Sequence, residues 1–172
     1  MIILVVGDFG VGKDIFADML LSHFTQPAQK IKSYTTRQRR SWNEDTHIFV
    51  PKKDWIEYIN ECPSDILAQT EIDNNFYGTF KHQFDCNCFN IYVVDDIGVR
   101  DVLNANIDDV YIIEIIRPIE LIDVPEERIK RNRTDSYHYQ ADYRIINDGS
   151  KENLDDIAKD VVLFLELNKP IK

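Results

Sequence analysis

Cysteine is scarce in this sequence of 172 residues, and its scarcity excludes two classes of small protein. The three cysteines, Cys62, Cys86 and Cys88, are an odd number, and no two of them have the spacing C-x₂-C. They therefore imply neither a disulfide framework nor a zinc site. We expect all three to be free thiols.

Long hydrophobic runs are also lacking. The first apolar run, residues 2–6, ends at Gly7 and is too short for a signal peptide. No segment approaches the roughly 18 apolar residues of a membrane-spanning helix, so we expect a cytoplasmic protein with no membrane partner. The hydrophobic content of 44% and charged content of 29% are ordinary for a globular enzyme, and predict a single domain over residues 1–172.

Positive charge is in the minority, with 20 Lys and Arg against 30 Asp and Glu and a net charge of −10. This balance predicts no nucleic-acid partner, because an acidic protein repels phosphate backbones at long range. Eleven of the 20 basic residues nevertheless fall in two segments, 30–53 and 128–133. Such concentration favours local sites for phosphate groups, and a solvated charged face is the alternative.

Glycine is sparse as well, yet three of the six glycines lie within residues 7–12. Residues 7–14 read GDFGVGKD, which has the form GxxxxGK of a phosphate-binding loop and directly follows a strand-like run. Glycines let successive backbone N–H groups point into one concavity, and Lys13 adds a cation where the β- and γ-phosphates of ATP lie. A helix predicted from Lys13 to His23 directs its N-terminal dipole at the same anion. The residues predicted to bind ATP here are Asp8, Phe9, Gly10, Val11, Gly12, Lys13 and Asp14.

The residue that follows the lysine departs from the usual loop. It is commonly Ser or Thr, whose hydroxyl binds Mg²⁺, and here it is Asp14. A carboxylate beside a triphosphate is repelled unless a cation lies between them, so Asp14 is predicted to bind the Mg²⁺ that accompanies ATP, directly or through water. A loop tuned for weak nucleotide binding is the alternative.

Strand and helix signals alternate along the rest of the chain. Strand-like runs cover residues 47–50, 90–94, 110–116 and 143–146, and helical patterns cover 53–61, 98–104 and 151–167. This alternation predicts an α/β fold with a mostly parallel central sheet and a ligand at the C-terminal ends of its strands. Residues 60–90 fit neither element, and their turn-rich part at 73–75 predicts an inserted hairpin or loop module that covers a second substrate.

Three further motifs resemble the acceptor-binding part of guanylate kinases. They are Ser33-Tyr34-Thr35-Thr36-Arg37 with Arg40, His47-Ile48-Phe49-Val50, and Phe76-Tyr77-Gly78-Thr79. The resemblance runs from Gly7 to Asp148. It implies a P-loop NTPase three-layer sandwich with helices on both faces of the sheet. Its implied parts are a core of residues 1–32 and 90–172, an acceptor-binding module of about 33–89 and a short lid of about 125–140.

This resemblance also implies the residues that hold the acceptor. They are Ser33, Arg37, Arg40, His47, Tyr77, Gly78, Thr79 and Asp95. Arg37 and Arg40 would bind the acceptor phosphate, since a guanidinium fork contacts two oxygens at once. Asp95, or its neighbour Asp96, would lie near the base and the metal. The predicted metal ligands are therefore Asp95 and the Asp14 of the glycine loop.

The resemblance further implies groups around the donor and the transferring phosphoryl group. Three lid arginines, Arg128, Arg131 and Arg133, would close over that group and act in catalysis with Lys13. Asn147 and Asp148 would lie beside the adenine of ATP.

Two positions differ from the guanylate kinase pattern. The family has a glutamate that reads the base nine residues before the tyrosine of its Tyr-Gly pair, and this chain has Ala68 there. Glu71 or Asp73 would replace it only after a shift of register. The family also has Tyr where this chain has His47.

Other kinases of this fold share some of these features. Gly-Lys-Asp in the loop, His47 and the Asn-Asp-Gly-Ser sequence at 147–150 resemble ribose 1,5-bisphosphate phosphokinases, which accept a sugar phosphate. Viral deoxynucleoside monophosphate kinases also carry Gly-Lys-Asp.

Together these features predict transfer of the γ-phosphoryl group of Mg·ATP to a nucleoside monophosphate, with GMP or dGMP preferred. Such transfer requires alignment of two anions and neutralisation of charge rather than a general base. A non-catalytic guanylate kinase-like module that binds a phosphopeptide or protein, and a slow nucleotide sensor, are the alternatives. The sequence predicts no oligomeric state.

Overall fold

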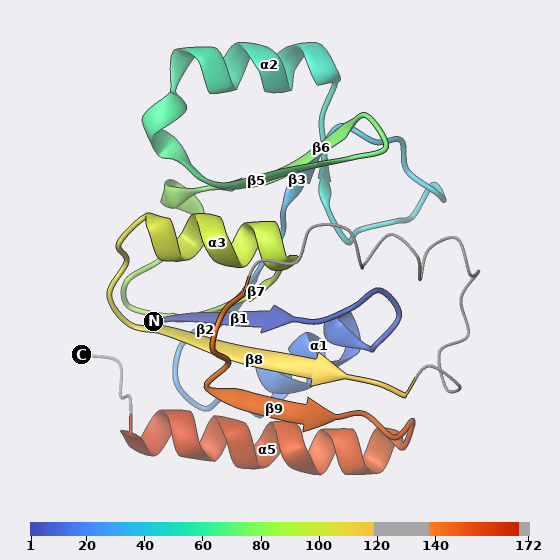
Figure 1. Cartoon of the computed structure of the whole chain (residues 1–172), viewed down its shortest axis with the longest axis vertical. Coiled ribbons are helices and arrows are strands. Elements are labelled where there is room, and N and C mark those ends of the chain that lie inside the picture. Colours follow the sequence, from blue (N-terminus) through green and yellow to red (C-terminus); the bar gives the residue numbers. More distant parts are fainter. Residues whose placement is uncertain (119–137, 169–172) are drawn as a thin grey trace.

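The computed structural model describes residues 1–118 and 138–168 of the chain. These residues form a five-stranded sheet and a four-stranded sheet with helices packed around both (Figure 1). The larger sheet has the order β2 (Ala28–Ile31), β7 (Phe89–Val93), β1 (Ile2–Val6), β8 (Val110–Ile116) and β9 (Tyr143–Ile146). Every neighbouring pair in it is parallel, which confirms the predicted parallel central sheet.

Helices cover both faces of the larger sheet. Helices α1 (Lys13–His23) and α5 (Lys151–Asn168) pack on one face, and α3 (Asp96–Asn104) packs on the other (Figure 1). The arrangement is the predicted three-layer sandwich. Because parallel strands are joined by crossover helices, the chain segments that follow β1 and β7 emerge at the same edge of the sheet.

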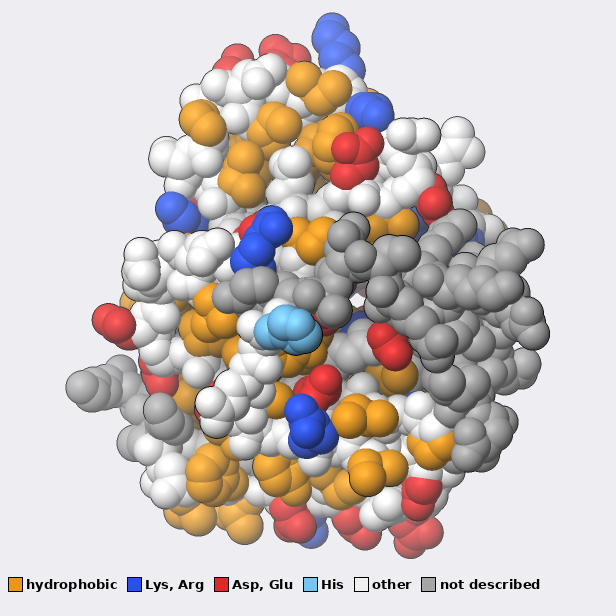
Figure 2. Space-filling model, in the orientation of Figure 1, with side chains coloured by type: hydrophobic (Ala, Val, Ile, Leu, Met, Phe, Trp, Pro, Cys, Tyr) orange, Lys and Arg blue, Asp and Glu red, His pale blue; other side chains and the backbone are white. Residues whose placement is uncertain are grey.

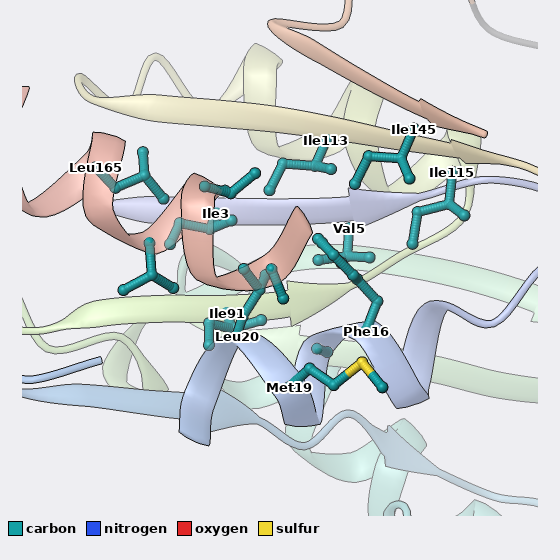
Figure 3. Close-up of a cluster of buried hydrophobic side chains, with 14 of the residues drawn as sticks. Ile3, Val5, Phe16, Met19, Leu20, Ile91, Ile113, Ile115, Ile145 and Leu165 are labelled. Atoms are coloured by element: carbon teal, nitrogen blue, oxygen red, sulfur yellow. The ribbon is translucent and has the colours of Figure 1, made fainter. Parts of the chain in front are cut away.

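Strand β1 lies at the centre of the core and is buried over its whole length. Alternate side chains of a strand point to opposite faces. Ile3 and Val5 accordingly join the cluster under α1 and α5 (Figure 3). Leu4 joins the cluster under α3. Burial on both faces explains why β1 reads as a continuous apolar run rather than an alternating one.

The smaller sheet has the order β4 (Ile48–Phe49), β3 (Tyr34–Thr35), β6 (Asn75–Phe80) and β5 (Ile66–Ile72). Strands β5 and β6 form the predicted hairpin, and Asp73 and Asn74 at its turn have positive φ angles of 51° and 61°. Short polar residues adopt this backbone more readily than others. The sequence patterns did not predict the sheet itself, because two of its strands have only two residues each.

Helix α2 (Lys52–Glu61) covers the smaller sheet through Trp55, whose side chain is 2% exposed. The Trp55 ring packs against Phe76 and Phe80 of β6. A Cβ atom on Gly78 would lie 2.6 Å from Cη2 of Trp55, so a glycine lets the helix approach the strand. Two short 3₁₀ helices, η1 (Pro63–Asp65) and η2 (Lys81–Gln83), flank the hairpin.

The sequence placed most elements within two residues of their observed bounds. Helix α1 and strands β8 and β9 have the predicted ends. Strand β2 was missed, because its four residues AQKI are mostly half-buried and carry no clear strand pattern. In the part of the chain that the structure covers, no helix combines the length and hydrophobicity needed to cross a membrane.

Candidate functional site

The glycine loop between β1 and α1 has a backbone that suits glycine. The φ angles are 146° at Gly7, 81° at Gly10 and 100° at Gly12. A Cβ atom on Gly7 would collide with the carbonyl oxygen of Ile115, and one on Gly12 would lie 2.8 Å from Nδ2 of Asn147. Helix α1 begins directly after this loop, so the unpaired N–H groups of its first turn face the loop.

Lys13 holds this loop together from inside. Its Nζ donates hydrogen bonds to the carbonyl oxygens of Gly7 at 2.7 Å and Asp8 at 2.8 Å. Burial lowers the pKa of Lys13, and the charges of Asp14 and Asp8 oppose that shift. Its side chain also lines a cleft, where the ammonium group can reach an anion.

Asn147, at the end of β9, braces the glycine loop. Its side chain is 5% exposed, its Nδ2 donates to the carbonyl oxygen of Val11 at 2.7 Å, and its Oδ1 accepts from the Gly149 N–H. The Asp148 carboxylate accepts from the Ser150 N–H at 2.9 Å, directly before α5. The predicted contact of Asn147 and Asp148 with adenine stays a prediction.

A cleft of about 480 Å³ joins the glycine loop to the smaller sheet. The predicted site residues that line it are Phe9, Lys13, Asp14, Ser33, Arg37, Arg40, His47, Tyr77 and Asp95. They come from the loop after β1, from the segments around β3, β4 and β6, and from the end of β7. This volume falls in the range of small-molecule sites, roughly 300 to 1,000 Å³.

Other predicted residues lie beside the cleft rather than in its lining. Gly78 faces Trp55, and Thr79 is fully buried in β6. Asp8 and Val11 line a second hollow of about 340 Å³ together with Asp96. The lid arginines Arg128, Arg131 and Arg133 lie outside the described residues, as does most of the predicted lid at 125–140.

Arg37 forms a two-pronged ion pair within the cleft. Its Nη1 and Nη2 donate to the two carboxylate oxygens of Glu44 at 3.0 Å and 2.5 Å, and each side chain is 10% exposed. The Arg37 guanidinium also lies over the ring of Phe49, 5.0 Å from its centre. The hydrogen bond with Glu44 raises the pKa of Arg37, and the same bond holds the pKa of Glu44 far below its usual range.

His47 supplies a neutral polar group to the lining of the same cleft. Burial, and then the nearby charge of Arg37, lowers its pKa, so the imidazole is uncharged at neutral pH. The ring lies edge-on to Tyr77 with 5.7 Å between centres, and its Nδ1 is 2.8 Å from Oγ1 of Thr46. His47 can therefore offer a hydrogen bond to a ligand without adding charge.

The lining of the cleft also includes hydroxyl groups. Burial raises the pKa of Tyr92 to about 12, and Tyr92 and Ser33 both line the cleft. Ala68 is 2% exposed and stands opposite Thr79 in the ladder.

The two carboxylates considered as substitutes for a base-reading glutamate lie differently. Asp73 lines the cleft. Glu71 pairs with Phe76 in the ladder, so strand alternation turns it toward the face that α2 covers.

Asp14 and Asp95 meet part of what a magnesium ion needs. Both line the cleft, and both charges act on Lys13. Asp14 Oδ1 lies 3.3 Å from Lys30 Nζ, and Asp95 Oδ1 accepts the Gly98 N–H at 2.8 Å. Among the described residues, no three His, Cys, Asp or Glu side chains are grouped for a metal. Mg²⁺ commonly takes one or two carboxylates and completes its shell with phosphates and water, so this pair fits an ion that arrives with ATP.

Glu44 and Tyr92 are among the lining residues that were not singled out from the sequence. Glu44 carried a weak signal, since it is an acid within the basic segment 30–53. Tyr92 carried none, because an aromatic residue in a buried strand such as β7 reads as core.

Charge on the visible surface is mixed. In Figure 2 the Lys and Arg side chains lie among acidic and uncharged ones on this face of the described residues. The expectation of no nucleic-acid partner stays a prediction.

Comparison with known proteins finds similarity to two guanylate kinases and to the structure of a sugar kinase. No protein-family model matches the sequence. A guanylate kinase of Mycoplasmoides gallisepticum is 28% identical over 187 residues, covering 98% of this chain and 94% of that protein. The crystal structure of guanylate kinase from Anaplasma phagocytophilum matches with a TM-score of 0.71 and 20% identity, covering 100% of this chain and 96% of that one. An unliganded sugar kinase from Janibacter sp. HTCC2649 matches with a TM-score of 0.51 and 14% identity, over 99% and 96% of the two chains. The structural likeness confirms the predicted fold.

Proposed function

We propose that this chain is a guanylate kinase-like phosphotransferase and that it transfers the γ-phosphoryl group of Mg·ATP to GMP or dGMP. One observation carries the proposal: a single cleft joins Lys13 of the glycine loop to Arg37 and Arg40 of the smaller sheet's loop. A donor phosphate bound at the first site and an acceptor phosphate bound at the second would share one cavity.

The proposed reaction forms a bond from an oxygen of the acceptor phosphate to the γ-phosphorus of ATP and breaks the bond to the β–γ bridging oxygen. The products are ADP and a nucleoside diphosphate. The attacking phosphate oxygen is already nucleophilic, so this chain has to align two anions and offset their repulsion. Lys13 and the first turn of α1 would stabilise charge on the donor, and Arg37 and Arg40 on the acceptor.

Mg²⁺, when bound with ATP, supplies further neutralisation at the β- and γ-phosphates. Asp14 and Asp95 are the residues that would hold it. Lys30 keeps the Asp14 carboxylate beside the first turn of α1, with its Nζ also 2.8 Å from Oδ1 of Asp18.

Asp14→Asn is expected to raise the Mg²⁺ concentration needed for half-maximal turnover by about tenfold, because an amide oxygen attracts the cation less than a carboxylate does. A titration of turnover against Mg²⁺ at fixed ATP measures the shift. Asp18→Asn is the matched control, since Asp18 also pairs with Lys30 and is as exposed as Asp14 at 67%. Equal Mg²⁺ dependence in wild type and Asp14→Asn would contradict a metal role for Asp14.

The acceptor is tested by a coupled assay of ADP release. Mg·ATP is offered with GMP, dGMP, AMP, dTMP, dCMP, UMP or ribose 1,5-bisphosphate, and Lys13→Ala serves as the blank. Rapid turnover of GMP or dGMP above the other acceptors is the expected result. A flat panel in a protein that binds ATP would contradict the kinase assignment and favour a binding or sensing role.

Ribose 1,5-bisphosphate stands in the panel because one observation favours a second acceptor class. Ala68, which is buried in the lining of the cleft, provides no carboxylate for the N1 and N2 donors of guanine. A sugar phosphate would need the arginines and the hydroxyls of Ser33 and Tyr92, and no base-reading group.

A further inference from the structure

The carboxylate of Glu44 occupies a built anion site within the loop between β3 and β4. It accepts from the Arg37 fork, from the backbone N–H of Arg40 at 2.7 Å and from the Thr46 hydroxyl at 3.1 Å. Arg39 donates a further hydrogen bond to the Glu44 carbonyl oxygen. The Glu44 carboxylate thus binds three residues at the proposed acceptor-phosphate site, Arg37, Arg40 and Thr46. None of the sequence motifs includes Glu44.

These contacts fix the orientation of Arg37. Glu44 engages both terminal nitrogens of its guanidinium, and the ring of Phe49 lies against the guanidinium face. The third guanidinium nitrogen, Nε, is buried and has no hydrogen-bond partner among the described residues. A buried N–H without a partner is unfavourable, and a ligand oxygen is the kind of group that would satisfy it.

Arg40 complements this donor. Its backbone N–H binds Glu44, and its guanidinium forms no hydrogen bond or ion pair with the residues that the structure describes, although it lines the cleft. Glu44 therefore anchors the main chain of one arginine and the side chain of the other. The charges left for a ligand are those of Arg37 and Arg40, reduced by that of Glu44.

We propose that Glu44 is the positioning residue of the acceptor-phosphate site: it holds Arg37 and the Arg40 backbone so that both guanidinium groups meet the acceptor phosphate, and it stays in place when the acceptor binds. The inference rests on the proposed function. Displacement of Glu44 would cost four hydrogen bonds and would leave its carboxylate beside a phosphate dianion. If Glu44 stays bound to Arg37 and Arg40, the hydrogen bonds are kept and the carboxylate is not left unpaired beside the phosphate.

The test is Glu44→Gln, which keeps the shape of the side chain and removes its charge. The KM for GMP is expected to rise by roughly tenfold to a hundredfold. The substitution replaces one of the two carboxylate oxygens that accept from Arg37 with an NH₂ group, and it removes the negative charge. The kcat and the KM for ATP should stay within about threefold of wild type, since binding of the acceptor is weakened equally in ground and transition states.

Asp45→Asn is the matched control. Asp45 is the next residue, carries the same charge and pairs with Lys32 at 2.7 Å, and its side chain is 85% exposed. This variant is expected to keep the wild-type KM for GMP.

Guanosine separates a positioning role from a general disturbance of the cleft, because it has the base and sugar of GMP without the phosphate. Its inhibition constant should be the same in wild type and Glu44→Gln. Equal weakening of guanosine and GMP would overturn the proposal, and so would an unchanged or a tighter KM for GMP in Glu44→Gln. A wild-type protein that neither binds nor phosphorylates GMP would overturn the proposed function and this inference together, whereas an active wild type with an unaltered Glu44→Gln overturns the inference alone.

Discussion

Lys13→Ala is expected to lower kcat by about 10³-fold and to leave the protein folded. The ammonium group of Lys13 is the cation that reaches the cleft from the glycine loop, and phosphoryl transfer depends on charges placed beforehand at the moving group. Burial removes water from the charged side chain and thereby lowers its pKa. The hydrogen bonds to the carbonyl oxygens of Gly7 and Asp8 offset the cost of that desolvation. Removing the side chain removes both the cost and the bonds, and stability should change little.

The measurement is kcat with the preferred acceptor, together with thermal unfolding of both proteins. Lys81→Ala is the matched control, because the Lys81 Nζ also donates to a backbone carbonyl, that of Ser64 at 2.7 Å, and Lys81 does not line the cleft. It should keep wild-type turnover. A folded Lys13→Ala that retains more than a tenth of wild-type kcat would show that the lysine is not the cation that the reaction uses.

The glycine loop was readable from sequence because all of its parts are contiguous. Residues 7–14 carry the glycines and the lysine, and the strand and helix on either side have their own periodic patterns. Gly7 illustrates the limit of that reading. Its collision partner is the carbonyl oxygen of Ile115, which the sequence places more than one hundred residues away and the parallel pairing of β1 with β8 places alongside.

The acceptor side was readable in its residues and not in its contacts. The resemblance named Arg37, Arg40, His47 and Tyr77, and all of them line the cleft. It gave no partner for Arg37, because the fork with Glu44 depends on the path of a loop rather than on a repeating pattern. Pairing between side chains in irregular segments leaves no periodic trace in a sequence, and for that reason Glu44 had to come from the structure.

Helix α3 shows the same division on a smaller scale. Its apolar pattern predicted a start at Gly98, and the helix begins two residues earlier at Asp96. Asp95 caps it by accepting the Gly98 N–H, so the aspartate that the resemblance placed near base and metal also stabilises the start of this helix. A capping role and a ligand role for Asp95 use different oxygens of one carboxylate and are compatible.

Trp55→Ala is expected to lower the free energy of unfolding by about 3 to 5 kcal/mol, the usual cost of replacing a large buried aromatic residue with alanine. Trp55 is the buried residue of α2 and packs on Phe76 and Phe80, so its loss detaches the helix from the smaller sheet. Its indole N–H is buried without a partner among the described residues, which places the expected loss toward the lower end of that range.

The consequence for binding should be one-sided. The smaller sheet positions Arg37 and Tyr77, whereas the glycine loop rests on the separate cluster that contains Phe16 and Val5. Trp55→Ala should therefore weaken GMP binding by at least tenfold and leave ATP binding within about threefold of wild type. Urea unfolding followed by circular dichroism gives the stability, and calorimetric titration with each nucleotide gives the two affinities.

The chain's second tryptophan provides the control. Trp42 is 91% exposed, and Trp42→Ala should change the free energy of unfolding by no more than about 0.5 kcal/mol. Weakening of ATP and GMP binding by the same factor in Trp55→Ala would mean that the two sheets lose structure together. Weaker binding of GMP with unchanged binding of ATP would mean that the smaller sheet can lose structure while the glycine loop stays intact. Such independence is what a kinase needs when it admits a second substrate beside bound ATP.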